Sequence, residues 1–220
     1  MIKLFCGYDP REALGFHVFV HSVLKHASRP VQIIPLHSNA APQGTNEFTY
    51  SRFLVPWLCG YADHAIFVDA SDMLMLDDVF DLDALFDPQF AVQCVQRPDY
   101  ETRHPMKYSG TSMEAVNRNY PSKNWASVMV FNCAHSAWRR VDPLSIQKLA
   151  NVNLLQFKGL VDDEIGRLPA AWNRLVDEGD AIEGAKLLHW TAGIPAFPVY
   201  SRAPAADRWF DAHREMVVLP

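Results

Sequence analysis

The sequence predicts an α/β domain, a three-layer sandwich in which helices cover both faces of a mostly parallel central sheet. Short apolar runs alternate with segments of helical periodicity from the first residues onward, which is typical of this fold class. With 220 residues, 49% of them hydrophobic, the chain can bury one substantial core. Neither an internal repeat nor a linker-like segment divides it, so we expect a single domain over residues 1–220.

The first elements are a strand, a helix and a second strand. Residues 2–8 (IKLFCGY) form an apolar run, and Asp9 with Pro10 opens a helix. The apolar positions of this helix recur at intervals of three and four residues: Ala13, Phe16, Val20, Val23 and Ala27. Pro30 ends the helix, and residues 31–36 (VQIIPL) are the next strand.

The central elements follow a loop. Residues 38–47 are rich in Asn, Pro, Gln and Gly, which predicts a loop, and Tyr50 to Leu54 predict a helix that ends or kinks near Pro56. The apolar run at 65–76 (AIFVDASDMLML) is then interrupted by two carboxylates. A short acidic helix at 79–85 and a strand at 90–96 (FAVQCVQ) come next.

Hydrophobic periodicity disappears between Arg97 and Trp125. This segment has few apolar anchors, and loops of this length in a compact domain are usually functional, so we expect a substrate-facing lid. A strand at 126–133 (ASVMVFNC) restores the sheet. The remaining predicted elements are a polar helix at 143–152, a last strand at 185–191 and an amphipathic segment at 207–219.

Asp69 and Asp72 are the most informative residues, because they follow directly on a buried strand. In α/β proteins, ligands bind outside the carboxyl ends of the strands, so acids at that edge are candidates for holding a metal or a sugar. Eight Asp residues lie between Asp63 and Asp87, and no Lys or Arg occurs from Phe53 to Gln96. This local charge favours a hard divalent cation as partner. For the five later members we expect ordinary capping and turn roles: Asp77, Asp78, Asp81, Asp83 and Asp87.

Two further positions could meet the acid pair at the same sheet edge. Asp162 and Asp163 precede a turn, and His189 ends the last strand. Two carboxylates and an imidazole suit Mn²⁺, or alternatively Mg²⁺ with oxygen ligands, and such an ion could grip a diphosphate. The competing interpretations are that Asp162 and Asp163 cap a short helix at 164–166 and that His189 is a hydrogen-bonded core residue.

Composition excludes some classes of function. The formal net charge of −5 argues against a general nucleic-acid binder, because no segment supplies a basic face. There is no apolar run of about 18 residues and no N-terminal secretion signal, so we expect no transmembrane segment and a cytoplasmic location.

Ordered motifs resemble those of the family 8 glycosyltransferases, the glycogenin and bacterial galactosyltransferase group. Residues 49–76 resemble that family's Tyr and Arg helix followed by a strand ending in a DxD motif. Residues 126–133, 168–173 (LPAAWN) and 186–193 (KLLHWTAG) resemble its later strand, its Leu-Pro-aromatic-Asn turn and its terminal Lys, His and Gly motif. The resemblance implies a GT-A fold with a Rossmann-like nucleotide-binding half.

The resemblance also implies roles for residues along the chain. Residues 4–27 are similar to the family's opening strand and helix, whose first turn lines the nucleobase pocket, so Tyr8 and Asp9 become candidate nucleotide contacts; a helix cap is the alternative for Asp9. Asp69, Asp72 and His189 become candidate metal ligands. Lys186 and Gly193 become candidate donor contacts through the terminal motif. Sugar transfer also needs carboxylates near the anomeric carbon, so Asp162 or Asp163 is the candidate catalytic residue that orients the hydroxyls of the donor sugar. Arg52 is a further candidate catalytic residue, with a surface salt bridge as its alternative.

Two departures from the family pattern affect these assignments. The acids read D-A-S-D, one residue longer than DxD, so Asp69 and Asp72 cannot both take the family positions without a bulge or a changed turn. The terminal motif lacks the Lys and Trp that follow its Gly in the family. Arg202, Arg52 or Lys186 could supply the phosphate-contacting cation instead.

The expected function is therefore metal-dependent transfer of a sugar, with retention, from a nucleotide-diphosphate donor such as a UDP-hexose. The acceptor, whether glycan, lipid-linked sugar or protein, leaves no motif in the sequence. Two alternatives remain open: a catalytically inactive GT-A-like domain that binds a nucleotide or glycan, and a phosphatase of the haloacid dehalogenase type, which also places an Asp pair after an apolar strand.

Overall fold

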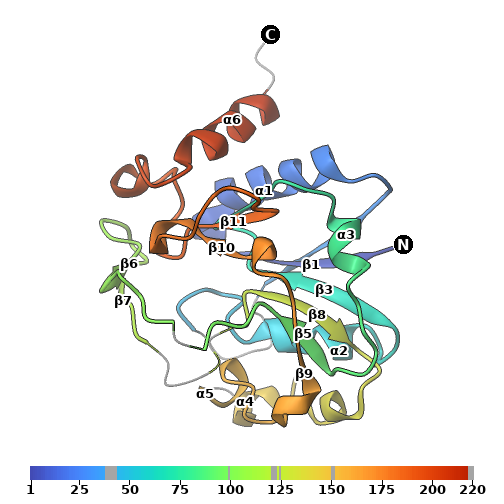
Figure 1. The fold of residues 1–220 in the computed structure, drawn as a ribbon. Coiled ribbons are helices and arrows are strands. Elements are labelled where there is room, and N and C mark those ends of the chain that lie inside the picture. Colours follow the sequence, from blue (N-terminus) through green and yellow to red (C-terminus); the bar gives the residue numbers. More distant parts are fainter. Residues whose placement is uncertain (38–43, 99, 120–122, 124, 150–151, 218–220) are drawn as a thin grey trace.

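A six-stranded sheet forms the centre of the protein (Figure 1), as seen in a computed structural model that describes residues 1–37, 44–98, 100–119, 123, 125–149 and 152–217. The strand order is β2-β1-β3-β8-β5-β9. The bounds, in that order, are Gln32–Leu36, Lys3–Gly7, His64–Val68, Val128–Asn132, Val92–Cys94 and Ile165–Arg167. Strand β8 runs antiparallel to both neighbours, whereas the other three pairings in this described sheet are parallel. The expected mostly parallel α/β sheet is confirmed.

Both faces of this sheet are covered because successive strand residues point to opposite sides. On one face Leu4 and Cys6 of β1 pack with Phe16 and Phe19 of α1 (Ala13–His26). On the other face Phe5 packs into a cluster that includes residues of α2 (Val55–Leu58) and α5 (Val152–Leu155). The result is the predicted three-layer sandwich.

A second, three-stranded sheet lies beside α1 and carries part of the site. Its order is β10-β11-β4, with bounds Arg174–Leu175, Leu187–His189 and Met73–Met75. The helix α6 (Ala206–Met216) covers it through Trp209, which packs with Val18 of α1 and Trp190. Figure 1 shows α6 stacked on α1, away from the side of the sheet where α4 (Ile146–Leu149) and α5 lie. The amphipathic segment expected at 207–219 is confirmed over its described residues, 207–217. Residues 218–219 lie outside the described set.

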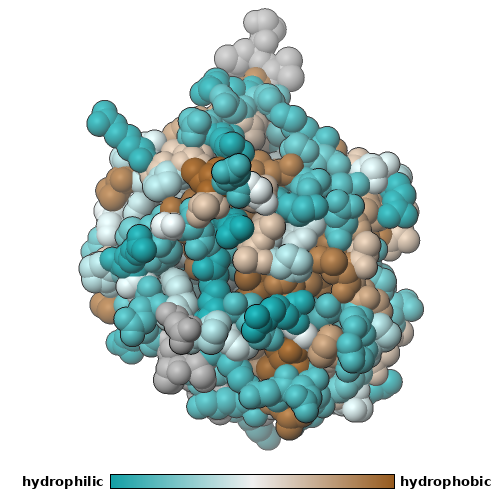
Figure 2. All heavy atoms as spheres, in the orientation of Figure 1, coloured by the Kyte–Doolittle hydropathy of each residue, from teal (hydrophilic) through white to brown (hydrophobic). Residues whose placement is uncertain are grey.

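The remaining described elements are short. They are α3 (Val79–Asp83), the hairpin of β6 (Met106–Lys107) and β7 (Ala115–Val116), and 3₁₀ turns at Pro10–Glu12, Ser51–Leu54, Ser136–Arg140, Asp162–Glu164, Ala170–Trp172, Val176–Glu178 and Pro198–Tyr200. Figure 2 shows hydrophilic side chains over most of the visible face, with apolar side chains in smaller patches between them. Within the described residues, no helix has both the length and the apolar character needed to cross a membrane.

Several local predictions need correction. Pro56 lies in the first turn of α2, where its missing N–H costs no helical hydrogen bond, so it does not end a helix. The predicted helix at 143–152 is instead α4 and α5, with residues 150–151 outside the described set. Residues 164–166, expected as a short helix in one interpretation, complete a 3₁₀ turn and enter β9.

Two of the five later aspartates have the capping and turn roles expected of them, and the other three form ion pairs. Asp78 caps α3 by accepting from the Phe80 N–H, and Asp87 accepts from the Gln89 N–H in a turn. Asp83 pairs with His64 at 2.8 Å. Asp77 and Asp81 both pair with Lys186. None of these five acids lines the cavity described below.

Candidate metal centre and its pocket

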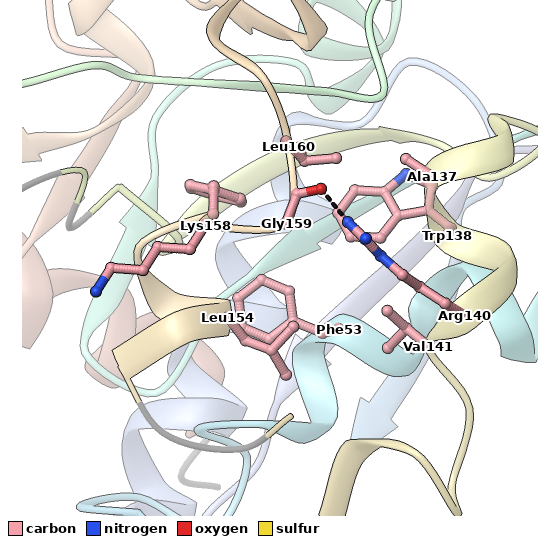
Figure 3. Close-up of a pocket in the computed structure, with 10 residues that line it drawn as sticks. Phe53, Ala137, Trp138, Arg140, Val141, Leu154, Lys158, Gly159 and Leu160 are labelled. Carbon is pink, nitrogen blue, oxygen red and sulfur yellow. Dashed lines mark hydrogen bonds between the residues drawn. The ribbon is translucent and has the colours of Figure 1, made fainter. Parts of the chain in front are cut away.

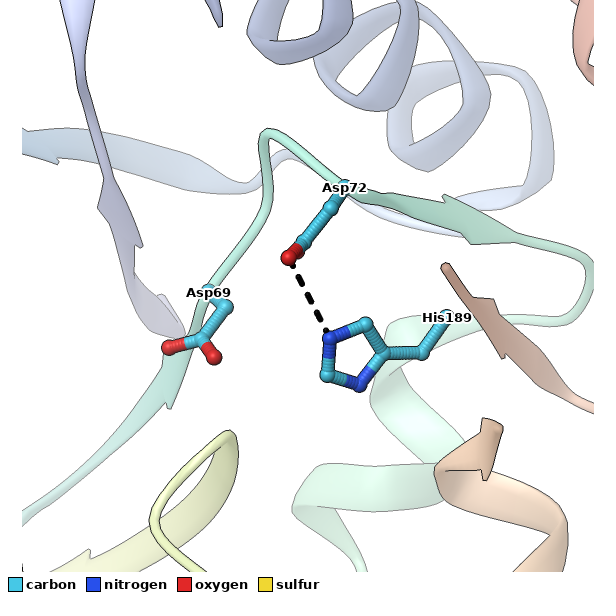
Figure 4. A group of neighbouring side chains, drawn as sticks. All are labelled: Asp69, Asp72 and His189. Carbon is cyan, nitrogen blue, oxygen red and sulfur yellow. Dashed lines mark ion pairs between the residues drawn. The ribbon is translucent and has the colours of Figure 1, made fainter. Parts of the chain in front are cut away.

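A tight turn between β3 and β4 brings Asp69 and Asp72 to one side. Asp69 follows the last residue of β3, and Ala70 takes a left-handed conformation with φ of 66°. The Ser71 N–H donates to the Asp69 carbonyl at 2.8 Å, and the Met73 N–H donates to the Ala70 carbonyl at 2.9 Å. This changed turn absorbs the additional residue of D-A-S-D, so both carboxylates reach the same group of ligand atoms (Figure 4).

Gly15 of α1 allows the helix to approach this turn closely. A Cβ atom built on Gly15 would lie 2.0 Å from the carbonyl oxygen of Ser71, a distance that no packing tolerates. The hydroxyl of Ser71 also donates to the Gly7 carbonyl at the end of β1, at 3.4 Å. The acid turn is therefore held between α1 and β1, and only glycine fits at position 15 without moving it.

Strand β11 places His189 opposite the acid turn. Its antiparallel register pairs His189 with Met73, and the Trp190 N–H donates to the Asp72 carbonyl at 2.9 Å. The Nε2 atom of His189 lies 3.3 Å from Asp72 Oδ2 (Figure 4), and Nδ1 lies 2.9 Å from the amide oxygen of Asn173. Because an amide oxygen only accepts, Nδ1 carries a proton and Nε2 faces the acids, the arrangement common in metal-binding histidines.

Arg52 holds the other carboxylate. Its Nη1 lies 2.7 Å from Asp69 Oδ1, and the same atom donates to the Ala126 carbonyl at 2.7 Å. Its Nε donates to the Thr49 carbonyl at 2.9 Å. Only 8% of the Arg52 side chain is exposed, so the surface salt bridge considered from the sequence is wrong. Arg52 instead fixes Asp69 from within the protein.

The buried charges at this centre influence one another. Burial, together with the charge of Asp72, raises the pKa of Asp69 against the opposing effect of Arg52. Burial also acts to raise the pKa of Asp72, but the charge and hydrogen bond of His189 and the charge of Lys107 lower it overall. Burial acts to lower the pKa of His189, yet Asp72 and Asp69 raise it overall. Without a cation, the site favours a protonated His189 beside an ionised Asp72.

The donor atoms fit a divalent metal. One ligand atom each from Asp69, Asp72 and His189 can be chosen so that all lie within 4.8 Å of one another. With bonds of about 2.1 Å, octahedral ligands lie roughly 3 Å apart when adjacent and about 4.2 Å apart when opposite. Asp72 Oδ1 is buried and receives no hydrogen bond from the described residues. A bound cation would give this oxygen the partner that buried polar atoms usually have. The set of two oxygens and one nitrogen suits Mn²⁺.

These ligands line a cavity of about 500 Å³, a size usual for small-molecule sites. Its other described lining residues include four cations and three aromatic side chains: Arg52, Arg97, Lys107, Arg118, Phe48, Tyr100 and Tyr108. Asp69 and Asp72 are the carboxylates among the described residues of this lining. A ligand with negative charge next to the metal position would therefore be matched by the surrounding cations.

The segment from Arg97 to Trp125 forms one wall of the cavity, and it is better anchored than the sequence indicates. Tyr108 and Met113 are 1% and 5% exposed, so the expectation of few apolar anchors is wrong. Glu178 accepts hydrogen bonds from the Tyr100 hydroxyl, the Thr102 hydroxyl and the Arg103 N–H. A single carboxylate thus ties the start of the segment to the turn after β10.

A second cavity, of about 330 Å³, has a different character (Figure 3). It is lined mainly by apolar residues of the opposite layer, including Phe53, Trp138 and Phe157, with Arg140 and Lys158 beside them. The described lining contains no carboxylate or histidine. It offers neither metal ligands nor a general base, and the acidic cavity is the candidate functional site.

The two predicted nucleotide contacts at the end of β1 lie apart from the described lining of the acidic cavity. Asp9 is buried and caps the following 3₁₀ turn, and its carboxylate receives hydrogen bonds from Arg11 and from the Glu47 N–H. Tyr8 packs edge-on against Phe16, with ring centres 5.1 Å apart. These hydrogen bonds match the helix-cap interpretation of Asp9, and a nucleotide contact by Tyr8 or Asp9 stays a prediction.

Lys186 and Gly193, the two candidate donor contacts of the terminal motif, are not among the described residues that line the acidic cavity. Lys186 lies at the opposite end of β11 from His189 and pairs with Asp77 at 2.8 Å and with Asp81 at 3.2 Å. Gly193 has φ of 155°, and a Cβ there would lie 2.5 Å from the ring of Tyr200, whose hydroxyl accepts from the Ser109 N–H. Gly193 therefore permits a contact that holds the 97–125 segment. Arg202 is exposed.

Asp162 and Asp163 are not brought into the metal group. Both are exposed in the 3₁₀ turn before β9, and Asp162 pairs with Lys123. Neither is among the described residues that line the acidic cavity. Their role as contacts for a donor sugar stays a prediction, without support from this geometry.

Sequence reasoning missed several residues of the site, among them Arg97, Lys107, Tyr108 and Asn173. The first three lie in the segment without periodicity, where no pattern predicts which side chains turn inward. Asn173 was visible as part of LPAAWN, but its partner His189 lies 16 residues away along the chain. Only the parallel pairing of β10 with β11 brings these two together.

Comparisons with known proteins agree with this architecture. No protein-family model matches the chain. Protein CDI of Arabidopsis thaliana is 36% identical over 229 residues, covering 97% of this chain and 86% of that protein. A solved structure of galactosyltransferase LgtC in complex with donor and acceptor sugar analogs matches all of this chain and 98% of its own, with a TM-score of 0.66 and 14% identity.

The WbbM bifunctional glycosyltransferase is also similar, with a TM-score of 0.64 and 15% identity over 96% of this chain. The chain spans about half of that protein, 49% of its length. At these identities the structural matches establish the fold, which is the GT-A glycosyltransferase fold expected from the resemblance to family 8.

Proposed function

The chain belongs to the protein family of Arabidopsis Protein CDI and has the GT-A fold, and from its site we propose that it is a metal-dependent glycosyltransferase using a nucleotide-diphosphate sugar. The observation that carries the proposal is the convergence of Asp69, Asp72 and His189, from two sheets, on the wall of a cation-lined cavity. The donor is proposed to be a UDP-hexose, by resemblance to family 8, and the cation Mn²⁺ or Mg²⁺.

The chemistry of sugar transfer explains this set of residues. The bond between the anomeric carbon and the phosphate oxygen breaks, a bond from the acceptor oxygen to that carbon forms, and the proton of the acceptor hydroxyl passes to the departing phosphate. Negative charge develops on the departing diphosphate and positive charge on the sugar ring. A bound divalent ion supplies Lewis-acid stabilisation of the diphosphate.

The chain's own residues prepare the site for that charge. Arg52 fixes Asp69, and Asn173 fixes the ring of His189 so that Nε2 faces the acids. Groups held in this way need no reorganisation when charge develops. The cationic lining of the cavity adds to the attraction for a diphosphate.

The described lining offers no separate carboxylate that could act as a covalent nucleophile, because Asp69 and Asp72 are both assigned to the metal. Retention of configuration, expected from the resemblance, would then proceed without an enzyme-bound sugar. The acceptor is proposed to be a glycan, a lipid-linked sugar or a protein, reached through the 97–125 wall of the cavity. The haloacid dehalogenase alternative requires a different fold and loses its support.

A donor screen tests the proposal. Purified protein is incubated with Mn²⁺ and a panel of UDP-, GDP-, ADP- and CDP-sugars, and release of the nucleoside diphosphate is measured. We expect slow hydrolysis of one UDP-hexose that disappears with EDTA and in Asp72→Asn. Binding of UDP without turnover of any donor, even with glycan acceptors present, would instead support the inactive nucleotide-binding alternative.

A further inference from the structure

A diphosphate in the acidic cavity, together with the ionised Asp72, brings more negative charge to the metal position than one divalent cation neutralises. A positively charged side chain that is free to bind the phosphates would neutralise the remaining negative charge. Four cations line the described part of the cavity: Arg52, Arg97, Lys107 and Arg118. Their present partners decide which of them is available.

Two of the four are already engaged. Arg52 is paired with Asp69 and donates to the carbonyls of Ala126 and Thr49. Arg97 is paired with Asp180 and donates to the Asn173 carbonyl at 2.7 Å. Redirecting either arginine toward a ligand would leave a partly buried carboxylate without its partner, which is costly. Both therefore serve to hold the walls of the cavity.

The other two differ in exposure and surroundings. Arg118 is exposed, so its charge is screened by solvent. Lys107 is half-buried, and its charge reaches the centre, because it acts to lower the pKa of both Asp72 and the buried Glu12. Even so, no described carboxylate lies within ion-pair distance of its ammonium group. Lys107 is thus near the metal ligands without being committed to them.

The backbone at Lys107 is held in place by its neighbour. The Tyr108 N–H donates to the Ala192 carbonyl at 2.7 Å, and the Tyr108 hydroxyl donates to Asn46 at 3.1 Å. Lys107 itself pairs with Ala115 in the β6–β7 hairpin. A lysine on a fixed backbone with an uncommitted ammonium group is suited to receive an anionic ligand.

We propose that Lys107, on the wall of the cavity formed by the 97–125 segment, binds the diphosphate of the donor. This inference rests on the proposed function and goes beyond it by assigning the phosphate contact to the 97–125 segment. Neither Lys186, which is paired with Asp77 and Asp81, nor exposed Arg202 has this position.

The test compares Lys107→Gln with wild type in two separate titrations, Mn²⁺ alone and UDP at saturating Mn²⁺. We expect UDP to bind at least tenfold more weakly to the variant. Mn²⁺ alone should bind as tightly as before or more tightly, because a positive charge near the metal ligands has been removed. Lys107→Arg should keep most of the UDP affinity. Lys25→Gln, an exposed lysine paired with Glu215, is the control for loss of charge.

The outcomes separate the two proposals. Loss of both Mn²⁺ and UDP affinity in Lys107→Gln would mean that the lysine maintains the site rather than binding the phosphates, and would overturn the inference. Unchanged UDP affinity in Lys107→Gln would overturn it too and leave the proposed function standing. Failure of wild-type protein to bind UDP with Mn²⁺ would overturn the proposed function itself.

Discussion

Asp72 and Asp77 lie in the same acidic stretch but in opposite surroundings. Asp72 is 5% exposed, faces His189 and has an oxygen without a hydrogen bond, whereas Asp77 lies at the other end of the small sheet and pairs with Lys186. We predict that Asp72→Asn weakens Mn²⁺ binding at least tenfold, about 1.4 kcal/mol, and that Asp77→Asn leaves it within twofold. Isothermal titration with Mn²⁺ measures both. Equal losses would remove Asp72 from the metal site.

As a proposed metal ligand, His189 would make metal binding depend on pH. A metal binds the neutral imidazole, so a proton on His189 competes with the cation. Because Asp72 and Asp69 raise the pKa of His189 against the effect of burial, this competition extends above the usual value of about 6.5. We predict that Mn²⁺ affinity rises as pH increases through that higher value and that His189→Ala binds weakly with a flatter pH profile. If His189→Ala binds Mn²⁺ as tightly as the wild type, His189 is a structural core residue and not a metal ligand.

The ionisation of His189 and Asp72 also determines whether the stability of the folded protein rises or falls with pH. Because the pKa of His189 is higher in the folded than in the unfolded protein, its protonation stabilises the fold. This contribution is fully present below about pH 6.5 and is lost as the pH rises through the pKa of His189 in the folded protein. The lowered pKa of Asp72 contributes stability that is present above about pH 3.9 and is lost as pH falls through its own folded value. In the metal-free protein, this pair therefore stabilises the fold most between those limits.

At the scale of elements, α1 and the acid turn form one unit. The contact depends on Gly15, because any Cβ there meets the Ser71 carbonyl. We predict that Gly15→Ala lowers the melting temperature and weakens Mn²⁺ binding, although alanine is the better helix former. Leu14→Ala, at a position 41% exposed on the same helix, should change neither by a comparable amount. If Gly15→Ala keeps the melting temperature and the Mn²⁺ affinity of the wild type, the turn at residues 69–72 can move to accommodate a Cβ atom, and the prediction is wrong.

The 97–125 segment is held to the body of the protein through Glu178. Its carboxylate accepts three hydrogen bonds from residues 100–103, and those bonds outweigh the effect of burial and lower its pKa. We predict that Glu178→Ala accelerates limited proteolysis within this segment and that UDP with Mn²⁺ slows the cleavage again. Glu183→Ala, at an exposed position in the same part of the chain, is the matched control. Identical cleavage of the two variants would contradict the anchoring role.

The elements of the sheet were predictable from sequence because apolar runs and helical spacing report burial directly. The strand that carries Asp69, the last strand with His189 and the C-terminal helix all lie where their patterns place them. The β6–β7 hairpin was not predictable, since each of its strands has two residues and neither alternates in hydrophobicity. The contribution of Lys107 and Tyr108 to the cavity was hidden for the same reason.

Within the site, the group of candidate metal ligands was predictable and the residues that support it were not. Asp69, Asp72 and His189 each follow or end an apolar run, a feature that sequence displays. The left-handed turn at Ala70, the close approach at Gly15 and the hydrogen bond from His189 to Asn173 depend on contacts between segments far apart in the chain. Capping by Asp9 was one of two local interpretations, and the hydrogen bonds of its carboxylate match it, whereas the nucleotide contact stays a prediction.

On the scale of the whole molecule, the site joins two sheets. Asp69 directly follows β3 of the large sheet, whereas Asp72 precedes β4 and His189 ends β11 of the small one. Described residues of the 97–125 segment line the same cavity. A ligand that bridges these parts would bind the folded state alone and stabilise it by mass action.

The most direct test of the central claim is calorimetric titration of the protein with UDP, with Mn²⁺ present and then with EDTA. A diphosphate held through a metal on Asp69, Asp72 and His189 should bind at least tenfold more tightly with Mn²⁺, and Asp72→Asn should remove that difference. Equal affinity for UDP with and without the metal, or no binding under either condition, would contradict a metal-dependent nucleotide-sugar site.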